Sequence, residues 1–309
     1  MDVLSDAIAA TRTGRPHSSR TVKRAPWGVR FPASDGAGFH VVLQGSAWLL
    51  PPEGAEPVRL GVGDVVFLAH GYGHGLADRP ETPLEDAELE PDGSWPKLRH
   101  QGPVRGDDTL MLCGAYQLNK SRAHPLLTDL PSFIHLPARL GAHDRLRAAV
   151  DLLGAELADP QPGSDAVVLA LLDTLLLYLL RTWWLAERPA GPTGWAGALH
   201  DPAVTAALQA MHNDPARPWT VEELGAQASL SRAAFARRFT ALVGRPPLAY
   251  LTWWRMTTAG RLLRDGDVPL GTVAERAGYT SEFAFAKAFK REYGVAPGRY
   301  RKLGGATAS

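Results

Sequence analysis

The chain has very little cysteine, since Cys113 is the only one among its 309 residues. A single thiol excludes a disulfide within the chain and suits a reducing compartment such as the cytoplasm. The N-terminus begins Met1-Asp2-Val3 and lacks the positively charged and then apolar run of a signal peptide. We therefore expect a cytoplasmic protein.

Long apolar runs are also scarce. The one stretch long enough to span a bilayer, Ala166 to Ala186, contains Asp173 and Arg181, which are costly at membrane depth. We interpret it as a buried or interface helix and expect no membrane partner. An apolar content of 45% and a charged content of 21% are typical of a soluble globular protein.

The net charge is only +1, but the charges are unevenly distributed. Residues 198–309 hold 15 lysines and arginines against 9 acidic residues, a balance of +6. The rest of the chain holds 18 against 23, a balance of −5. The sequence therefore predicts a polyanionic partner for the C-terminal region alone.

The pattern of apolar residues changes along the chain. Short runs rich in β-branched or aromatic residues predict an antiparallel barrel or sandwich; they are Phe39–Leu43, Ala47–Leu50, Val65–Leu68 and Thr109–Leu118. The period then becomes helical, with candidate helices over Asp144–Leu157 and Asp165–Glu187. The Pro- and Gly-rich stretch Glu187–Trp195 is typical of a linker, and Asp201–Met211 begins a C-terminal helical region.

Two C-terminal stretches repeat one another. Around Ser231 and Ser281 they match at an offset of 50, which pairs Phe235 with Phe285, Phe239 with Phe289, Gly244 with Gly294 and Pro247 with Pro297. Each copy predicts a helix, a tight turn and a second, capped helix whose aromatic residues point inward, the layout of a helix-turn-helix. The alternative is two ordinary helical hairpins. This is the weaker interpretation, because the two copies are in register and lie within a basic region.

Helix signals accompany the repeat. Thr220 is a good N-cap, and Glu223 three residues later can complete a capping box. Gly225 and Ala274 are small where the second helix must pass close. Gly278 suits a turn residue with positive φ.

The segment Leu270–Arg301 resembles the signature of the AraC/XylS family of bacterial transcription regulators, and Thr220–Leu263 is similar to that family's first half and linking helix. The resemblance covers roughly residues 200–302. It implies a seven-helix domain whose two recognition helices enter successive major-groove segments of double-stranded DNA, about 34 Å apart.

Motif position in the resembling family implies which residues meet DNA. The set comprises Ser231, Arg232, Ala233, Ala236, Arg237 and Arg238 on the first helix, and Ser281, Glu282, Phe283, Ala284, Lys287, Lys290 and Arg291 on the second. Ala233, Ala236 and Arg237 would face bases on the first helix, so direct readout there depends on Arg237, which can bond bidentately to guanine. The second helix would present Glu282, Phe283, Ala284 and Lys287 to the bases. Phosphate contacts would come from Arg232, Arg238, Lys290 and Arg291.

The N-terminal strands resemble the cupin barrel found in front of many AraC-type domains, through Phe39–Gly45, Gly63–Val65 and Gly71–His74. The second cupin motif is recognisable, with Ala69 where proline is usual and Asp78 where asparagine is usual. The two leading histidines and the glutamate of the first motif are absent, which argues against the metal-dependent oxygenase chemistry of enzymatic cupins.

Three residues of the expected barrel are candidate metal ligands. His40 has inward-facing parity, His74 stands at the cupin ligand position, and Cys113 lies in a strand. Two histidines and a thiolate are adequate zinc ligands. The alternative is that both histidines are packed, hydrogen-bonded barrel residues and the cysteine a small buried hydrophobe. Some resembling members pair this cysteine with a second one for redox sensing, but a rough alignment places Thr21 there. This excludes a disulfide switch within one chain but leaves oxidation of the thiolate or loss of a metal open.

The leucines between residues 169 and 179 form a broad apolar stripe. The stripe either packs as core against the barrel or, as the resemblance implies, forms an antiparallel dimer contact. Dimerisation would place two C-terminal domains on paired half-sites.

Together these features predict an α+β chain with an N-terminal cupin-like β-barrel, a middle helical dimerisation segment and a C-terminal all-α domain with two helix-turn-helix motifs. The expected domains are the sensor barrel at 1–136, the helical hairpin at 137–187, the linker at 188–197 and the DNA-binding domain at 198–305. The expected function is a DNA-binding transcription regulator, not an enzyme, with a small-molecule, metal or redox effector. RNA polymerase is a possible further partner. The alternatives are a metal-dependent cupin enzyme with a DNA-binding appendage, and an architectural DNA binder without an effector.

Overall fold

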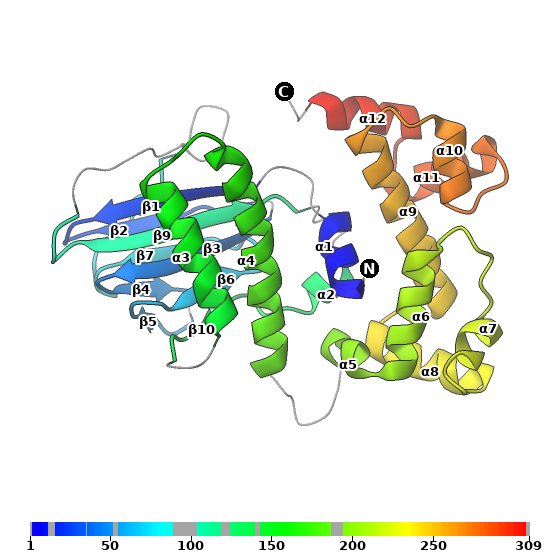
Figure 1. Cartoon of the computed structure of the whole chain (residues 1–309), viewed down its shortest axis with the longest axis horizontal. Coiled ribbons are helices and arrows are strands. Elements are labelled where there is room, and N and C mark those ends of the chain that lie inside the picture. Colours follow the sequence, from blue (N-terminus) through cyan, green and yellow to red (C-terminus); the bar gives the residue numbers. More distant parts are fainter. Residues whose placement is uncertain are drawn as a thin grey trace. The chain divides into compact units, whose positions relative to one another are not determined.

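The computed structural model describes residues 2–11, 16–34, 36–51, 55–88, 104–118, 124–139, 143–186 and 194–306 (Figure 1). They form two compact units. One unit comprises residues 13–121 and 130–187 and contains the strands, and the other comprises residues 1–12, 122–129 and 188–309 and is helical. The chain is therefore α+β, as its sequence predicts.

The strand unit contains two five-stranded sheets (Figure 1). The first has the order β1 (His17–Lys23), β9 (Thr109–Tyr116), β3 (Ala37–Gln44), β6 (Val65–Leu68) and β10 (Ile134–Leu136). The second has the order β5 (Val58–Leu60), β4 (Ala47–Leu50), β7 (His74–Ala77), β2 (Gly28–Phe31) and β8 (Glu85–Asp86). Neighbouring strands are antiparallel except β2 and β8, which run parallel. The pairing confirms the predicted antiparallel strand domain.

An apolar core forms where residues two apart face the same side of a strand. Both sheets contribute to one buried cluster, which includes Trp27, Val42, Leu49, Leu60, Val66, Leu68, Leu76 and Met111. Cys113 packs against this cluster two residues after Met111. His40 lies two residues before Val42, so the inward-facing parity predicted for His40 is confirmed.

Two helices follow the strands in the same unit, α3 (Asp144–Ala158) and α4 (Ser164–Ala186), and they pack against each other. The hydroxyl of Tyr116 donates a hydrogen bond of 2.8 Å to the carbonyl of Leu172, which ties α4 to β9. By length and composition alone, the part of α4 from Ser164 to Trp184 could cross a membrane, and 28% of that span is buried within the chain.

The helical unit contains the predicted C-terminal region. Its helices are α1 (Val3–Thr11), α2 (Pro125–Thr128), α5 (Gly194–His200), α6 (Pro202–Asn213), α7 (Val221–Ala226), α8 (Arg232–Val243), α9 (Pro247–Asp265), α10 (Leu270–Arg276), α11 (Glu282–Tyr293) and α12 (Pro297–Ala306). Helix α5 begins inside the stretch predicted as a linker, and residues 187–193 of that stretch lie outside the described part of the chain.

The unit boundaries differ from the predicted ones, because α1 and residues 124–129 group with the C-terminal helices. Buried polar and aromatic contacts explain this grouping. The Tyr250 hydroxyl lies 3.1 Å from Nε2 of His124 and 2.7 Å from Nε2 of His212. His212 in turn contacts the Asp6 carboxylate of α1 through Nδ1 at 3.3 Å. The ring of His124 also packs edge-on against the ring of Trp195, with 4.6 Å between the two ring centroids. These segments are therefore parts of the core of the helical unit.

Candidate functional sites: a DNA-reading face and a barrel cavity

The first helix-turn-helix copy consists of α7 and α8. Thr220 and Glu223 form the predicted capping box at the start of α7. Ser231 begins α8 by accepting a hydrogen bond of 3.3 Å from the Ala234 amide. Gly225 lets the helices approach, since a Cβ there would lie 3.2 Å from the Cβ of Phe235. The predicted cap residues and the small contact residue therefore hold the positions expected of them.

The second copy, α10 and α11, repeats this geometry closely. Ser281 caps α11 through the Ala284 amide at 3.1 Å. The ring centroids of Phe285 and Phe289 are 5.6 Å apart at 50°, and the matching pair in α8 is 5.6 Å apart at 51°. All four rings are fully buried. The same sequence spacing thus gives the same packed core in both copies.

The outer faces of α8 and α11 contain most of the predicted DNA-binding residues. Exposed positions are Ser231, Arg232, Ala233, Arg237 and Arg238 on α8, and Ser281, Glu282, Phe283, Ala284, Lys287, Lys290 and Arg291 on α11, whereas Ala236 is half-buried. Within the described residues, Arg237 and Lys287 have no hydrogen bond or ion pair with another side chain. Both are therefore available to a partner. Arg291 lies 3.8 Å from the neighbouring carboxylate of Glu292.

Two of the predicted residues are directed toward the protein. The guanidinium of Arg238 forms an ion pair with Asp201, the residue that caps α6 through the amides of Ala203 and Val204. The carboxylate of Glu282 lies over α10, where a Cβ on Gly271 would come within 2.7 Å of it. These contacts make Arg238 and Glu282 weaker candidates for DNA contacts than their motif positions imply.

Helix α9 separates the two copies. It has 19 residues, so it is about 28 Å long at 1.5 Å per residue. Arg255 on α9 donates hydrogen bonds to the carbonyls of Pro215 and Arg217, which fixes α9 against the loop that precedes the first copy. A rigid spacer of this length suits two recognition helices that read DNA about one helical turn apart.

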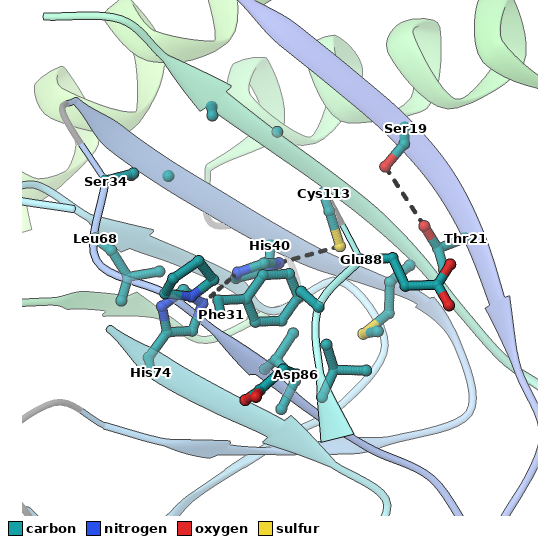
Figure 2. Close-up of a pocket in the computed structure, with 18 of the residues that line it drawn as sticks. Ser19, Thr21, Phe31, Ser34, His40, Leu68, His74, Asp86, Glu88 and Cys113 are labelled. Carbon is teal, nitrogen blue, oxygen red and sulfur yellow. Dashed lines mark hydrogen bonds between the residues drawn. The ribbon is translucent and has the colours of Figure 1, made fainter. Parts of the chain in front are cut away.

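The strand unit encloses a second candidate site, a cavity of about 360 Å³ between its two sheets. Figure 2 shows side chains of both sheets around it, among them Ser19, Thr21, Phe31, His40, His74 and Cys113. The ring of Phe31 stacks on His74 with centroids 4.8 Å apart and an interplanar angle of 6°. Ser19 and Thr21 lie on the opposite side from His74 in this view, with their hydroxyls 3.4 Å apart.

At one end of the cavity a chain of hydrogen bonds joins the three predicted metal ligands (Figure 2). Nδ1 of His40 is 3.1 Å from Sγ of Cys113, and its Nε2 is 2.8 Å from Nε2 of His74. Burial lowers the pKa of His40 well below its ordinary value and that of His74 to about 4, and it raises the pKa of the Cys113 thiol to about 12. All three groups are therefore neutral at neutral pH.

Neutrality fixes the direction of every bond in the chain. Nδ1 of His74 faces the carbonyl of Tyr72 at 3.2 Å, and a carbonyl can only accept, so this nitrogen carries the proton. Nε2 of His74 then accepts from Nε2–H of His40. Nδ1 of His40 must accept in turn, so the thiol of Cys113 is the donor.

This arrangement does not fit a zinc site of three ligands. The two ring nitrogens of His40 are directed to two different partners, so His74 and Cys113 lie on different sides of its ring. Among the described residues, no group of three or more histidine, cysteine, aspartate or glutamate side chains is placed to hold one metal ion. Zinc binding through His40, His74 and Cys113 stays a prediction.

The sequence did not identify the other walls of the cavity. Ser19, directly opposite Cys113 in the strand register, lies in β1, and Phe31 lies at the end of β2. Neither strand was predicted, since β2 has only four residues and β1 is largely polar. The sequence signal for β1 is weak, because its two buried residues, Ser19 and Thr21, are small and polar.

Comparisons with known proteins match the strand-rich part and the helix-turn-helix part of the chain to two separate family models. A family model described as Cupin matches residues 2–184, and one described as Helix-turn-helix domain matches residues 224–303. An AraC-like transcription regulator of Streptomyces lividans is 35% identical over 303 residues, which cover 98% of each chain. The RCS-specific HTH-type transcriptional activator RclR of Escherichia coli (strain K12) is 33% identical over 266 residues, covering 85% of this chain and 84% of RclR. Among solved structures, the DNA-binding domain of AdpA in complex with a target DNA is 36% identical, with a TM-score of 0.33, and covers 35% of this chain and 96% of that one.

Proposed function

The chain belongs to the AraC-like transcription regulators, with a cupin domain ahead of a DNA-binding helix-turn-helix domain, and from this premise we propose that its barrel senses a small neutral molecule. DNA binding is the established part of the function. The proposal concerns what controls it.

The observation that carries the proposal is the cavity of about 360 Å³ between the sheets, which is partly open to solvent. This volume lies in the range of pockets that hold small organic ligands. The inner end offers neutral hydrogen-bonding groups beside the stacked rings of Phe31 and His74. The charged lining residues, Lys23, Glu85, Asp86 and Glu88, belong to β1 and the β8 segment, whereas the end formed by His40, His74 and Cys113 is neutral. An ion would lose its hydration at that end without an opposite charge in compensation, so a neutral, partly aromatic compound fits that end best.

An oxidant is the less favoured effector. The thiolate is the form of cysteine that reacts with oxidants, and Cys113 is held as a thiol by burial and by its hydrogen bond to His40. The name of the relative RclR describes that protein as RCS-specific. The chemistry around Cys113 supports a different effector class for this chain.

We also propose that the chain catalyses no reaction, because the ligand residues of the first cupin motif are absent from its sequence. Zinc between Nδ1 of His40 and Sγ of Cys113 would require the buried thiol to lose its proton, which its raised pKa opposes. Elemental analysis of the purified protein and of His74→Ala tests zinc. Sub-stoichiometric metal that is the same in both would refute it.

The regulator is proposed to act in the cytoplasm as a homodimer that contacts RNA polymerase. The leucine stripe predicted as the dimer contact is itself buried within the chain at Leu172, Leu175, Leu176 and Leu179, so a dimer would use another face of α4, where Val167 exposes 44% of its surface. Pairing of this face would place two DNA-binding units on paired half-sites. Sedimentation over a dilution series checks the dimer, and a single monomeric species at all concentrations would contradict it.

Effector binding is tested with the full-length protein and a library of small neutral aromatic compounds. A true ligand should raise the melting temperature of the wild type but not of Ser19→Leu, in which the added side chain occupies the cavity. At a concentration 100 times its dissociation constant it should stabilise the fold by about 2.7 kcal/mol. The same compound should change the affinity for a DNA duplex obtained by genome-wide mapping of bound sites. A compound that stabilises both proteins equally, or leaves DNA affinity unchanged, would refute the proposal.

A further inference from the structure

Phe283 is the most exposed large apolar side chain in the described part of the chain. It exposes 82% of its surface, and the next, Leu152, exposes 59%. Single exposed apolar residues are common on protein surfaces, so exposure alone indicates nothing. The position of Phe283 gives the exposure its meaning.

Phe283 is the second residue of α11, directly after the cap residue Ser281 and Glu282. Residues three and four apart lie on one face of a helix, so Phe283, Lys287 and Lys290 form a single stripe. This stripe is exposed, and it lies opposite the buried rings of Phe285 and Phe289. The first turn of α11 thus presents a phenyl ring with two lysines behind it.

Among the described residues, the acidic neighbour of Phe283, Glu282, makes no ion pair with Lys287 or Lys290. The carboxylate of Glu282 is directed over Gly271 of α10, where a Cβ would come within 2.7 Å of it. Lys287 has no hydrogen bond or ion pair with the described residues. The face is therefore apolar at its tip and positively charged behind it, which suits a groove lined with phosphates.

In a helix-turn-helix the N-terminal residues of the second helix contact base edges in the major groove. A phenyl ring can neither donate nor accept a conventional hydrogen bond, and the C5-methyl group of thymine is the apolar feature among those edges. We propose that Phe283 reads a thymine methyl group in the half-site bound by α11. The inference rests on α11 acting as a recognition helix in the DNA-binding function of the chain.

The test removes the methyl group without changing any hydrogen bond. Duplexes that bind full-length protein are selected from a random pool, and each thymine of the selected site is then replaced singly by deoxyuridine. At one position the replacement should weaken wild-type binding roughly fourfold, the effect of one methyl group withdrawn from water. Phe283→Ala, which preserves the helix, should bind the thymine and deoxyuridine duplexes equally.

Two further variants separate a specific contact from general damage. Phe283→Leu keeps an apolar side chain and should retain part of the thymine preference. Leu248→Ala removes another exposed apolar side chain, 42% exposed on α9, and should keep the full preference.

Three outcomes would overturn the inference. Deoxyuridine could weaken wild type and Phe283→Ala alike, which would assign the methyl contact to another residue. Phe283→Ala could bind the selected site as tightly as wild type, which would show that Phe283 makes no contact with the bases. The selection could enrich no sequence at all, which would refute base reading by α11 itself. This result differs from the first two, in which the protein still selects a site.

Discussion

The two helix-turn-helix copies have the same interior and different surfaces. Inside, the phenylalanine pairs have the same centroid separation, 5.6 Å, and both recognition helices end at a left-handed glycine, Gly244 with φ 76° and Gly294 with φ 73°. Outside, the offset of 50 pairs Arg232 with Glu282, Ala233 with Phe283 and Arg237 with Lys287. Packing constrains the repeat where side chains are buried, and the exposed faces have diverged.

The turns differ as well. Ser229 is left-handed with φ 54°, and its counterpart in the second copy is Gly278 with φ 75°. Both turns make the same backbone bonds, from Leu230 to the Gly225 carbonyl at 3.0 Å and from Tyr279 to the Ala274 carbonyl at 2.9 Å. One copy therefore adopts with a side chain the backbone conformation that the other adopts with glycine.

The largest expected effect concerns the shared interior. Phe239→Ala and Phe289→Ala each remove a fully buried ring, so each should lower the free energy of unfolding by about 3–5 kcal/mol. Chemical denaturation of each variant measures the loss. A variant that unfolds like the wild type would show that the two cores are not equivalent.

The next effect concerns the diverged surface. Arg237→Ala should weaken binding to the selected site by about 1–3 kcal/mol and relax the preference at one base pair. Lys290→Ala, at a predicted phosphate contact, should weaken cognate and random DNA alike and reduce the slope of log affinity against log salt concentration by about 0.9. Affinities at several salt concentrations separate the two effects. Equal losses on cognate and random DNA for Arg237→Ala would remove it from the base-reading set.

Replacing the left-handed turn residue should change stability by different amounts in the two copies. Gly278→Ser should destabilise the chain by about 2 kcal/mol, because it places a side chain in the left-handed region and 2.7 Å from the Ala216 carbonyl. Ser229→Gly should change stability by less than about 1 kcal/mol, since relief of strain offsets the added freedom of the unfolded chain. Thermal unfolding compares them, and equal losses would show that the two turns are equally strained.

The smallest effect is expected for Arg238. The Arg238 side chain is half-exposed, and the buried Asp201 carboxylate also accepts hydrogen bonds from the amides of Ala203 and Val204. Arg238→Ala should therefore lower stability by about 0.2–1 kcal/mol and change DNA affinity little. Arg232→Ala is the matched control on the same helix and should weaken all DNA, because Arg232 is exposed and has no partner within the described residues. A larger loss of DNA affinity for Arg238→Ala than for Arg232→Ala would contradict this assignment.

Local patterns in the sequence predicted the two copies because their caps, turns and buried rings lie within a few residues of one another. Contacts between distant residues could not be predicted in this way. The pairing of Arg238 with Asp201 spans 37 positions, and the contact of Asp6 with His212 spans 206. In the barrel, the sequence identified His40, His74 and Cys113 as neighbours. The direction of their hydrogen bonds depends on burial and on the Tyr72 carbonyl, which no spacing encodes.

The central claim is that one chain carries two unequal base-reading helices on a fixed spacer. Selection of binding sites from random duplexes by the full-length protein tests it most directly. The account predicts two blocks of preferred bases for each DNA-binding unit, about 10 base pairs apart. One block should be centred on a guanine, and Arg237→Ala should no longer prefer guanine at that position. The other block should contain a thymine, and Phe283→Ala should no longer prefer thymine at that position. A single block, or two blocks that neither variant alters, would contradict it.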